Sequence, residues 1–332
     1  MSTELAGKVA VVTGSGQGVA KGIAIGLARA GAKVITNNRT PGSGNLSTWM
    51  TKDEVEPLLT EQDRADIVSL LGDARTTADQ IIAEGGEAVP FFGDVSDHDT
   101  AARLVATATD LWGRIDILVN SAAGMGHGPF VDLTAEDWHY QTHAKLTGAF
   151  NTIHHALPVM LRQGSGRVFN ISSGAWVGVP SLAAYSAANA GLVAMTRALG
   201  TELWGTGITC NAFCPSANSR SHINWRAKMR QQLAGAGPEM DGVRAMIEHV
   251  EREHGSAEDL APLFVYLASE AGANVSAAVF DVTAGGRISR YGETTKVAEI
   301  NKAAGAWTLD ELTAAVPEQL LTGYVTPDRR LG

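Results

Sequence analysis

Short apolar runs alternate along the chain with longer amphipathic segments. The runs are rich in Val, Ile, Phe and Ala, which is the pattern of strands buried on both faces of a parallel sheet. The segments between them repeat apolar residues every three or four positions, as helices that cover such a sheet do. The runs lie at 8–13, 33–36, 88–92, 115–119, 168–171, 208–213 and 279–282. We therefore expect an α/β fold with one doubly wound parallel sheet of about seven strands and helices on both faces.

Three segments depart from this alternation. Residues 40–72 are inserted after the second strand, are rich in Gly, Ser and Thr at first and then become acidic and amphipathic. A segment of this length is usually a lid or an interaction element, with a surface decoration as the alternative. Residues 216–256 are polar, and residues 291–332 form a C-terminal extension with an apolar periodic segment at 307–321. We expect a single domain over residues 1–290, followed by this extension.

A glycine-rich turn, TGSGQGV at residues 13–19, joins the first strand to the first helix. Glycine lets the backbone approach a pyrophosphate, and the helix N-terminus supplies free N–H groups and the positive end of its dipole. A strand, a glycine turn, a helix and a second strand in this order are typical of the start of a Rossmann-type dinucleotide-binding fold. The predicted cofactor contacts in this turn are Thr13, Gly14, Ser15, Gln17, Gly18 and Val19.

Residues 171–189 carry two kinds of hydroxyl group beyond the fifth strand. Ser172 and Ser173 end the strand, and Tyr185 lies in the first turn of the next helix. Ligands bind at the carboxyl ends of strands in such sheets, so a serine and a phenol there can meet one small-molecule oxygen. A phenol serves as general acid or base when its pKa falls from about 10 toward neutrality. The strand register favours Ser173 as its partner, whereas counting back from Tyr185 favours Ser172.

The glycine turn and this stretch together resemble the short-chain dehydrogenase/reductase family over roughly residues 5–290, the insertion excepted. The family signature is a serine followed by Tyr-x-x-x-Lys, and its glycine loop is T-G-x-x-x-G-x-G. The resemblance implies hydride transfer between a nicotinamide cofactor and an alcohol or ketone, with Tyr185 as acid/base and Ser173 as ligand of the reacting oxygen. The insertion and the extension look like the branch that contains the hydroxyacyl-CoA dehydrogenase domain of peroxisomal multifunctional enzymes.

Two positions depart from the family's catalytic tetrad. Asn189 stands four residues after Tyr185, where the family has the lysine that lowers the tyrosine pKa and binds ribose. Lys145 stands where the family has an asparagine, in a segment, AKLTGAF, that resembles Val-Asn-Leu-x-Gly-x-Phe. In the family these two side chains meet through one water, so we expect an exchange in which Lys145 supplies the charge and Asn189 supplies neutral hydrogen bonds. The alternative is a solvated Lys145 and lost redox activity.

The end of the second strand bears on the choice of cofactor. An acidic residue there accepts the ribose hydroxyls of NAD, whereas an arginine accommodates the 2′-phosphate of NADP. This chain has Asn38 followed by Arg39, which favours NADP over NAD. The alternative is that Arg39 faces solvent or pairs within the acidic insertion. The resemblance adds further cofactor contacts at Asp94, Val95, Asn120, Ser121, Ala122, Tyr185, Asn189, Pro215 and Ser216.

Composition narrows the range of partners. The 332 residues are 45% hydrophobic and 18% charged, as in ordinary globular proteins, and a net charge of −9 argues against nucleic acid or an anionic membrane as a partner. There is no run of 18 apolar residues and no signal peptide. Cys210 and Cys214 are expected to be buried thiols in a reducing cytoplasm. No metal site is expected, because His154 and His155 are adjacent on a helix and point about 100° apart.

We therefore expect an NAD(P)-dependent oxidoreductase for a small-molecule alcohol or carbonyl substrate, with specificity encoded in residues 216–256. One alternative is a non-redox lyase or dehydratase that uses Tyr185 and Lys145 without net hydride transfer. Another is a nucleotide-binding protein that has lost catalysis. The family usually forms dimers or tetramers, so the resemblance also implies a homodimer or homotetramer.

Overall fold

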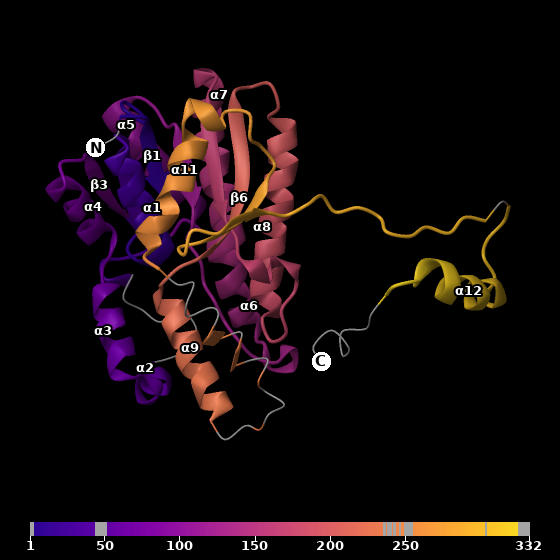
Figure 1. Cartoon of the computed structure of the whole chain (residues 1–332). Coiled ribbons are helices and arrows are strands. Elements are labelled where there is room, and N and C mark those ends of the chain that lie inside the picture. The colour runs from indigo at the N-terminus through magenta and orange to yellow at the C-terminus, as the bar shows by residue number, and fades with distance from the viewer. Residues whose placement is uncertain are drawn as a thin grey trace. The chain divides into compact units, whose positions relative to one another are not determined.

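The computed structural model describes residues 3–43, 52–234, 255–302 and 304–324, together with 237, 241, 244, 245, 247 and 248 (Figure 1). The chain divides into two compact units, residues 1–291 and residues 292–332. The second unit contains the helix α12 (Leu309–Ala315), which begins with a Thr308–Glu311 capping box and continues into the π-turn η9 (Val316–Leu320). The sheet lies in the first unit.

The sheet has eight strands in the order β3-β2-β1-β4-β5-β6-β7-β8. All neighbouring pairs are parallel except β7 and β8. This confirms the predicted doubly wound sheet, and the strand order reverses between β1 and β4, where such folds bind ligands. In chain order the strands are β1 (Val9–Val12), β2 (Lys33–Asn38), β3 (Ala88–Phe92), β4 (Ile117–Asn120), β5 (Gly166–Ile171), β6 (Ile208–Ser216), β7 (Val279–Thr283) and β8 (Ile288–Arg290).

The eighth strand was not expected from the sequence. β8 has three residues, all exposed, so it lacks the apolar run by which the other strands were predicted. It pairs with β7 after a tight turn in which Gly286 adopts φ +88°. A short antiparallel strand of this kind covers the edge of an otherwise parallel sheet.

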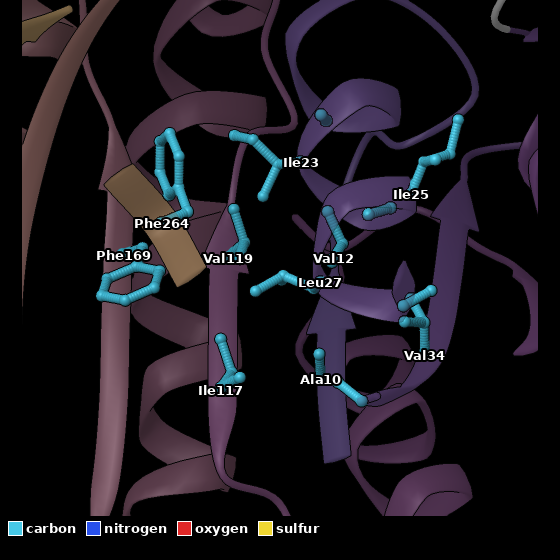
Figure 2. Close-up of a cluster of buried hydrophobic side chains, with 14 of the residues drawn as sticks. Ala10, Val12, Ile23, Ile25, Leu27, Val34, Ile117, Val119, Phe169 and Phe264 are labelled. Carbon is cyan, nitrogen blue, oxygen red and sulfur yellow. The ribbon is translucent and has the colours of Figure 1, made fainter. Parts of the chain in front are cut away.

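Helices cover both faces of the sheet, and the alternation of side chains along β1 shows how. Ala10 and Val12 face the core under α1 and α11, whereas Val9 and Val11 face the core under α5 and α7. Figure 2 shows the first of these cores, in which the labelled side chains of β1 and β4 lie opposite those of α1.

Within the described residues of this unit, the α-helices with assigned bounds are α1 (Gly18–Arg29), α2 (Lys52–Val55), α3 (Glu61–Ser69), α4 (Ala74–Ala83), α5 (His98–Trp112), α6 (Ala135–Thr142), α7 (Gly148–Gln163), α8 (Ala183–Glu202), α9 (Arg220–Leu233) and α11 (Ala261–Ala268). Short 3₁₀ helices are η2 (Glu56–Leu58), η3 (Phe130–Asp132), η5 (Gly174–Val177), η7 (Ala257–Leu260) and η8 (Glu270–Gly272).

The helical stretch between β4 and β5 is interrupted. α6 passes into a five-residue π-turn, η4 (His143–Thr147), which passes into α7. The π-turn buries two consecutive residues, Ala144 and Lys145. Single π-turns inside α-helices are frequent at functional sites, and no simple residue pattern predicts them.

The insertion packs against the polar segment that follows β6. Apolar side chains from residues 55–67 form a small core with Ile223 and Ala227 of α9. At its edge the carboxylate of Asp63 receives hydrogen bonds from the guanidinium groups of Arg226 and Arg230. Figure 1 shows α3 and α9 side by side beyond the end of the sheet. Residues 52–72 of the insertion and α9 therefore form one substructure, which we call the clasp.

Two expectations from composition can be compared with the structure. Among the described residues no helix is both long and apolar enough to cross a bilayer. Cys210 and Cys214 are buried free thiols, as predicted. Burial raises the pKa of each thiol to about 12, so neither is a reactive thiolate near neutral pH.

Candidate functional site

A cleft of about 630 Å³ lies at the carboxyl ends of the central strands. It is bordered by the glycine turn after β1, the ends of β2, β4 and β5, and the start of α9. Most of the predicted site residues lie along it. These are Gly14, Gln17, Gly18, Val19, Asn38, Arg39, Asp94, Val95, Ser121, Ala122, Lys145, Ser172, Ser173, Tyr185 and Pro215.

Five predicted contacts, Thr13, Ser15, Asn120, Asn189 and Ser216, are not among the lining residues of the cleft. Thr13 instead accepts hydrogen bonds from the backbone N–H groups of residues 121 and 122, at 2.9 and 3.1 Å. Asn120 donates to Asn170 at 3.0 Å and accepts from Thr152 at 2.6 Å. The side chains of Thr13 and Asn120 therefore fix the loops that border the cleft.

The glycine turn has the geometry that a dinucleotide pyrophosphate requires. Gly14 and Gly18 adopt φ +67° and +57°, a backbone conformation that residues other than glycine rarely adopt. A Cβ on Gly14 would also lie 3.0 Å from the backbone of Ala122. The N-cap of α1, Gln17, makes no side-chain capping bond, so the first N–H groups of the helix remain available to an anion.

Lys145 is buried beside Tyr185. Only 4% of the lysine is exposed, and its Nζ donates a hydrogen bond of 2.7 Å to the carbonyl oxygen of Ile171, at the end of β5. The same Nζ lies 5.9 Å from the centre of the Tyr185 ring. Burial lowers the pKa of Lys145 to about 8. The lysine is thus buried in the cleft and not solvated, which is the geometry that the exchange hypothesis requires.

Tyr185 lies beside Ser173 and Asn189. Burial raises the pKa of the phenol above its usual value, and these two polar side chains partly offset that effect. Asn189 is fully buried; its Nδ2 donates to the backbone oxygen of Tyr185 at 2.8 Å, and its Oδ1 has no partner within the described part of the chain. Ser172 donates to the backbone oxygen of Asn189 at 3.2 Å, so its hydroxyl is engaged elsewhere.

The far end of the cleft is set by Arg39 and its neighbours. Nε of Arg39 lies 3.2 Å from Oδ2 of Asp94, and its guanidinium lies over the Tyr140 ring at 5.9 Å from the ring centre. Arg39 therefore pairs with the loop after β3 and not with the described part of the insertion. The buried Oδ1 of Asn38 has no partner within the described structure, and a Cβ on Gly16 would lie 2.2 Å from it.

Several lining residues were missed by the sequence analysis. Tyr140 and Met125 come from α6 and from the loop after β4, and Ser219 and Arg220 come from the start of α9. A Cβ on Gly18 would lie 3.2 Å from Ser219, so α9 begins directly over the glycine turn. Nε of Arg220 is buried and has no partner in the described structure. The sequence analysis assigned specificity to the polar residues 216–256, but no pattern within them identified Ser219 or Arg220.

A second cavity of about 310 Å³ adjoins the cleft and shares Met125 and Tyr140 with it. Its lining mixes apolar side chains, among them Met125, Phe130, Leu133 and Leu182, with the polar side chains of His127, Asp132, Asp137, Gln141 and Ser181. Gln141 is 2% exposed and lines this cavity, and its Oε1 has no partner among the residues described.

Comparisons with known proteins agree with this geometry. A family model described as enoyl-(acyl carrier protein) reductase matches residues 58–286. A 3-oxoacyl-[acyl-carrier-protein] reductase of Synechocystis is 34% identical over 64% of this chain and 75% of its own length. The hydroxyacyl-CoA dehydrogenase ChsB1 of Mycobacterium tuberculosis is 29% identical over 95% of this chain and 89% of its own length. The crystal structure of a short chain dehydrogenase from Mycobacterium avium is 28% identical and superposes with a TM-score of 0.73, covering 97% of both chains.

These relatives are reductases and dehydrogenases, which confirms the prediction of an oxidoreductase that uses a nicotinamide cofactor, NAD or NADP. The non-redox and non-catalytic alternatives receive no support from them. Together with the doubly wound sheet and the glycine turn, the comparisons show that the chain belongs to the short-chain dehydrogenase/reductase family.

Proposed function

We propose that the chain interconverts a 3-hydroxyacyl and a 3-oxoacyl thioester with NADP(H), and that Lys145 takes the place of the family's catalytic lysine. The observation that carries this proposal is the buried ammonium of Lys145, 5.9 Å from the centre of the Tyr185 ring. A cation at that distance in a buried site favours the tyrosinate over the phenol.

The protein's part in the reaction is the movement of one proton. The nicotinamide, when bound, donates a hydride to the carbonyl carbon or accepts one from the alcohol carbon. In reduction, Tyr185 gives its phenolic proton to the carbonyl oxygen, while Ser173 donates a hydrogen bond to the same oxygen. The charge of Lys145 then stabilises the tyrosinate that remains. Because burial raises the pKa of Tyr185, the phenol is protonated at neutral pH and is ready to act as the acid in reduction.

The preference for NADP rests on the charges at the end of β2, and Arg220 adds a cation for the pyrophosphate that both cofactors share. Arg39 follows a neutral Asn38 at the end of β2, so the 2′-phosphate of NADP meets a cation and no carboxylate from β2. Arg39 shares its charge with Asp94, and we expect it to turn part of its guanidinium to the phosphate. Arg220, with its unpartnered Nε, lies beside the glycine turn, where the pyrophosphate is expected.

The acyl thioester is supported by the second cavity and by the relatives. The cavity adjoins the cleft, and the apolar part of its lining, Met125, Phe130, Leu133 and Leu182, can contact a short acyl chain. The unpaired amide oxygen of Gln141 can accept a hydrogen bond from a substrate N–H, such as those of a pantetheine arm. The hydroxyacyl-CoA dehydrogenase of Mycobacterium tuberculosis matches 95% of this chain. A homodimer or homotetramer remains a prediction from the family.

The test is oxidation of NADPH by the purified chain with 3-oxoacyl-CoA substrates of increasing length. We expect Lys145→Ala to lower kcat at least about 100-fold, as Tyr185→Phe does, because each removes part of the acid/base group. Lys8→Ala, at the opposite end of β1, is the matched lysine control and should leave kcat unchanged. Near-normal turnover by Lys145→Ala would refute the role of Lys145. Product formation without cofactor consumption would instead support the non-redox alternative.

A further inference from the structure

Three imidazole rings meet outside the cleft, between α5 and α7. His98 is the first residue of α5, and His154 and His155 lie in the middle of α7. The His98 ring centre lies 5.4 Å from that of His154 and 4.3 Å from that of His155, and the latter two are 5.1 Å apart. Each residue offers one ring nitrogen, and the three nitrogens all lie within 4.8 Å of one another.

This arrangement differs from what the sequence led us to expect. Adjacent residues on one helix point about 100° apart, so His154 and His155 alone were not expected to share a ligand. The ring from the neighbouring helix changes the geometry, because His98 lies against both of them. The sequence separation of His98 from the other two conceals this convergence.

The immediate surroundings favour a cation. Nε2 of His155 is buried and has no hydrogen-bond partner in the described structure, which is unusual for a buried polar atom. The carboxylate of Asp99 lies 3.9 Å from Nδ1 of His98 and supplies negative charge. Phe150 stacks on the His154 ring with its centre 5.7 Å away, which restricts the orientation of that ring.

We propose that His98, His154 and His155 together bind one divalent cation of the zinc type, with water in the fourth position. Neutral imidazoles are preferred ligands of Zn²⁺, Cu²⁺ and Ni²⁺, and three of them with one open position form a common tetrahedral set. Zinc–nitrogen bonds of about 2.0–2.1 Å place the ligand nitrogens roughly 3.3–3.4 Å apart. The three nitrogens now lie within 4.8 Å of one another, and we expect side-chain rotation to bring them to that separation.

The helices that carry the ligands are already fixed to each other. Side chains of α5 and α7 share the core beneath the sheet. In addition, Nδ2 of Asn151 in α7 donates to the carbonyl oxygens of Val95 and Ser96, just before α5, at 3.1 and 2.9 Å. The ligands are therefore held close before any metal binds, which lowers the entropic cost of binding.

The position of the site indicates a structural role. None of the three histidines lines the cleft, so the metal does not touch the reacting atoms. Asp94 and Val95, which do line the cleft, come four and three residues before His98. A metal that joins α5 to α7 would brace this edge of the cleft.

The test uses the full chain without an affinity tag, stripped with EDTA and titrated with Zn²⁺ by calorimetry. We expect one zinc ion per chain, a dissociation constant in the micromolar range or tighter, and a rise in Tm of several degrees at saturation. Co²⁺ provides a second probe, because tetrahedral coordination gives it strong visible absorbance. No stoichiometric binding of Zn²⁺ would overturn the proposal.

Variants assign the site to these residues. His98→Ala and His155→Gln should each weaken zinc binding at least tenfold and reduce the Co²⁺ absorbance. His139→Ala is the matched control: its ring lies 5.0 Å from that of His143, and the two form an exposed pair without a third imidazole in the described structure. It should leave the affinity unchanged. Loss of binding in His139→Ala but not in His98→Ala would refute the proposal. His98 is exposed at a helix start, so His98→Ala should fold even if His155→Gln does not.

Discussion

The ammonium of Lys145 lies 5.9 Å from the centre of the Tyr185 ring and is anchored 2.7 Å from the carbonyl oxygen of Ile171. Lys145 belongs to the π-turn η4, and Asn189, four residues after Tyr185, donates to the backbone oxygen of Tyr185 at 2.8 Å. A buried cation with one carbonyl partner lowers the stability of the fold. The chain nevertheless keeps this buried cation beside Tyr185, the predicted acid/base group.

Lys145→Met should stabilise the protein while it abolishes turnover. Burial lowers the lysine's pKa from 10.5 to about 8, which corresponds to a penalty of about 3 kcal/mol for the charged form. Methionine fills a similar volume without charge. We therefore expect a higher free energy of unfolding at pH 7, measured by urea denaturation, by up to about 3 kcal/mol.

The pH dependence of the free energy of unfolding provides the control for Lys145→Met. Between pH 8 and 10.5 the unfolded chain binds more protons at Lys145 than the folded chain does, so wild-type stability rises with pH across this window. The penalty is fully present below about pH 8. The stability gain of Lys145→Met should shrink as pH rises through that window. A gain that stays constant with pH would mean that the charge of Lys145 is not the cause.

Arg39→Ala should weaken binding of NADPH more than binding of NADH. Arg39 is the cation at the end of β2, and its partner Asp94 would be left to repel a 2′-phosphate. We expect the dissociation constant for NADPH to rise about tenfold, as measured by nucleotide fluorescence, with at most a twofold change for NADH. Equal losses for both cofactors would show that Arg39 does not read the phosphate.

Asp63→Ala should detach the insertion from α9. Burial favours the protonated acid, but hydrogen bonds from Thr60 and the guanidinium of Arg226 hold the pKa of Asp63 below its usual value. Asp63 is 1% exposed, and its removal takes away the buried carboxylate that receives hydrogen bonds from both Arg226 and Arg230. We expect a loss of about 3 kcal/mol in the stability of the clasp, seen as faster proteolysis within residues 52–72.

Glu56→Ala is the control for that experiment. Glu56 pairs with Arg64 on the surface, where both side chains are nearly half exposed. Exposed ion pairs contribute less than about 1 kcal/mol, so proteolysis should change little. If both variants are cleaved equally fast, the buried carboxylate is not what holds the clasp.

Local patterns were sufficient to predict the sheet and the glycine turn. Each of the seven parallel strands is an apolar run, and Gly14 and Gly18 stand where the backbone turns with positive φ. The position of the cleft at the carboxyl ends of the strands follows from the fold, because ligands bind there in open α/β sheets. These features depend on residues close in sequence, which is why the sequence alone contained them.

The rest depends on contacts between distant residues. Asp63 and Arg226 are separated by 163 positions, and nothing near either one predicts their pairing. The π-turn at Lys145 places the lysine against Ile171, 26 residues away, and His98 meets His154 from a different helix. Arg220 reaches the cleft only because α9 begins over Gly18.

The most direct test of the exchange of Lys145 and Asn189 is to reverse it. The rate of NADPH-dependent ketone reduction is compared among Lys145→Asn, Asn189→Lys and the double variant, with folding checked by circular dichroism. We predict that Lys145→Asn lowers the rate at least about 100-fold and that the double variant recovers most of this loss, because the charge returns beside Tyr185 from α8. A near-normal rate in Lys145→Asn, or a folded double variant as inactive as the single one, would contradict the account.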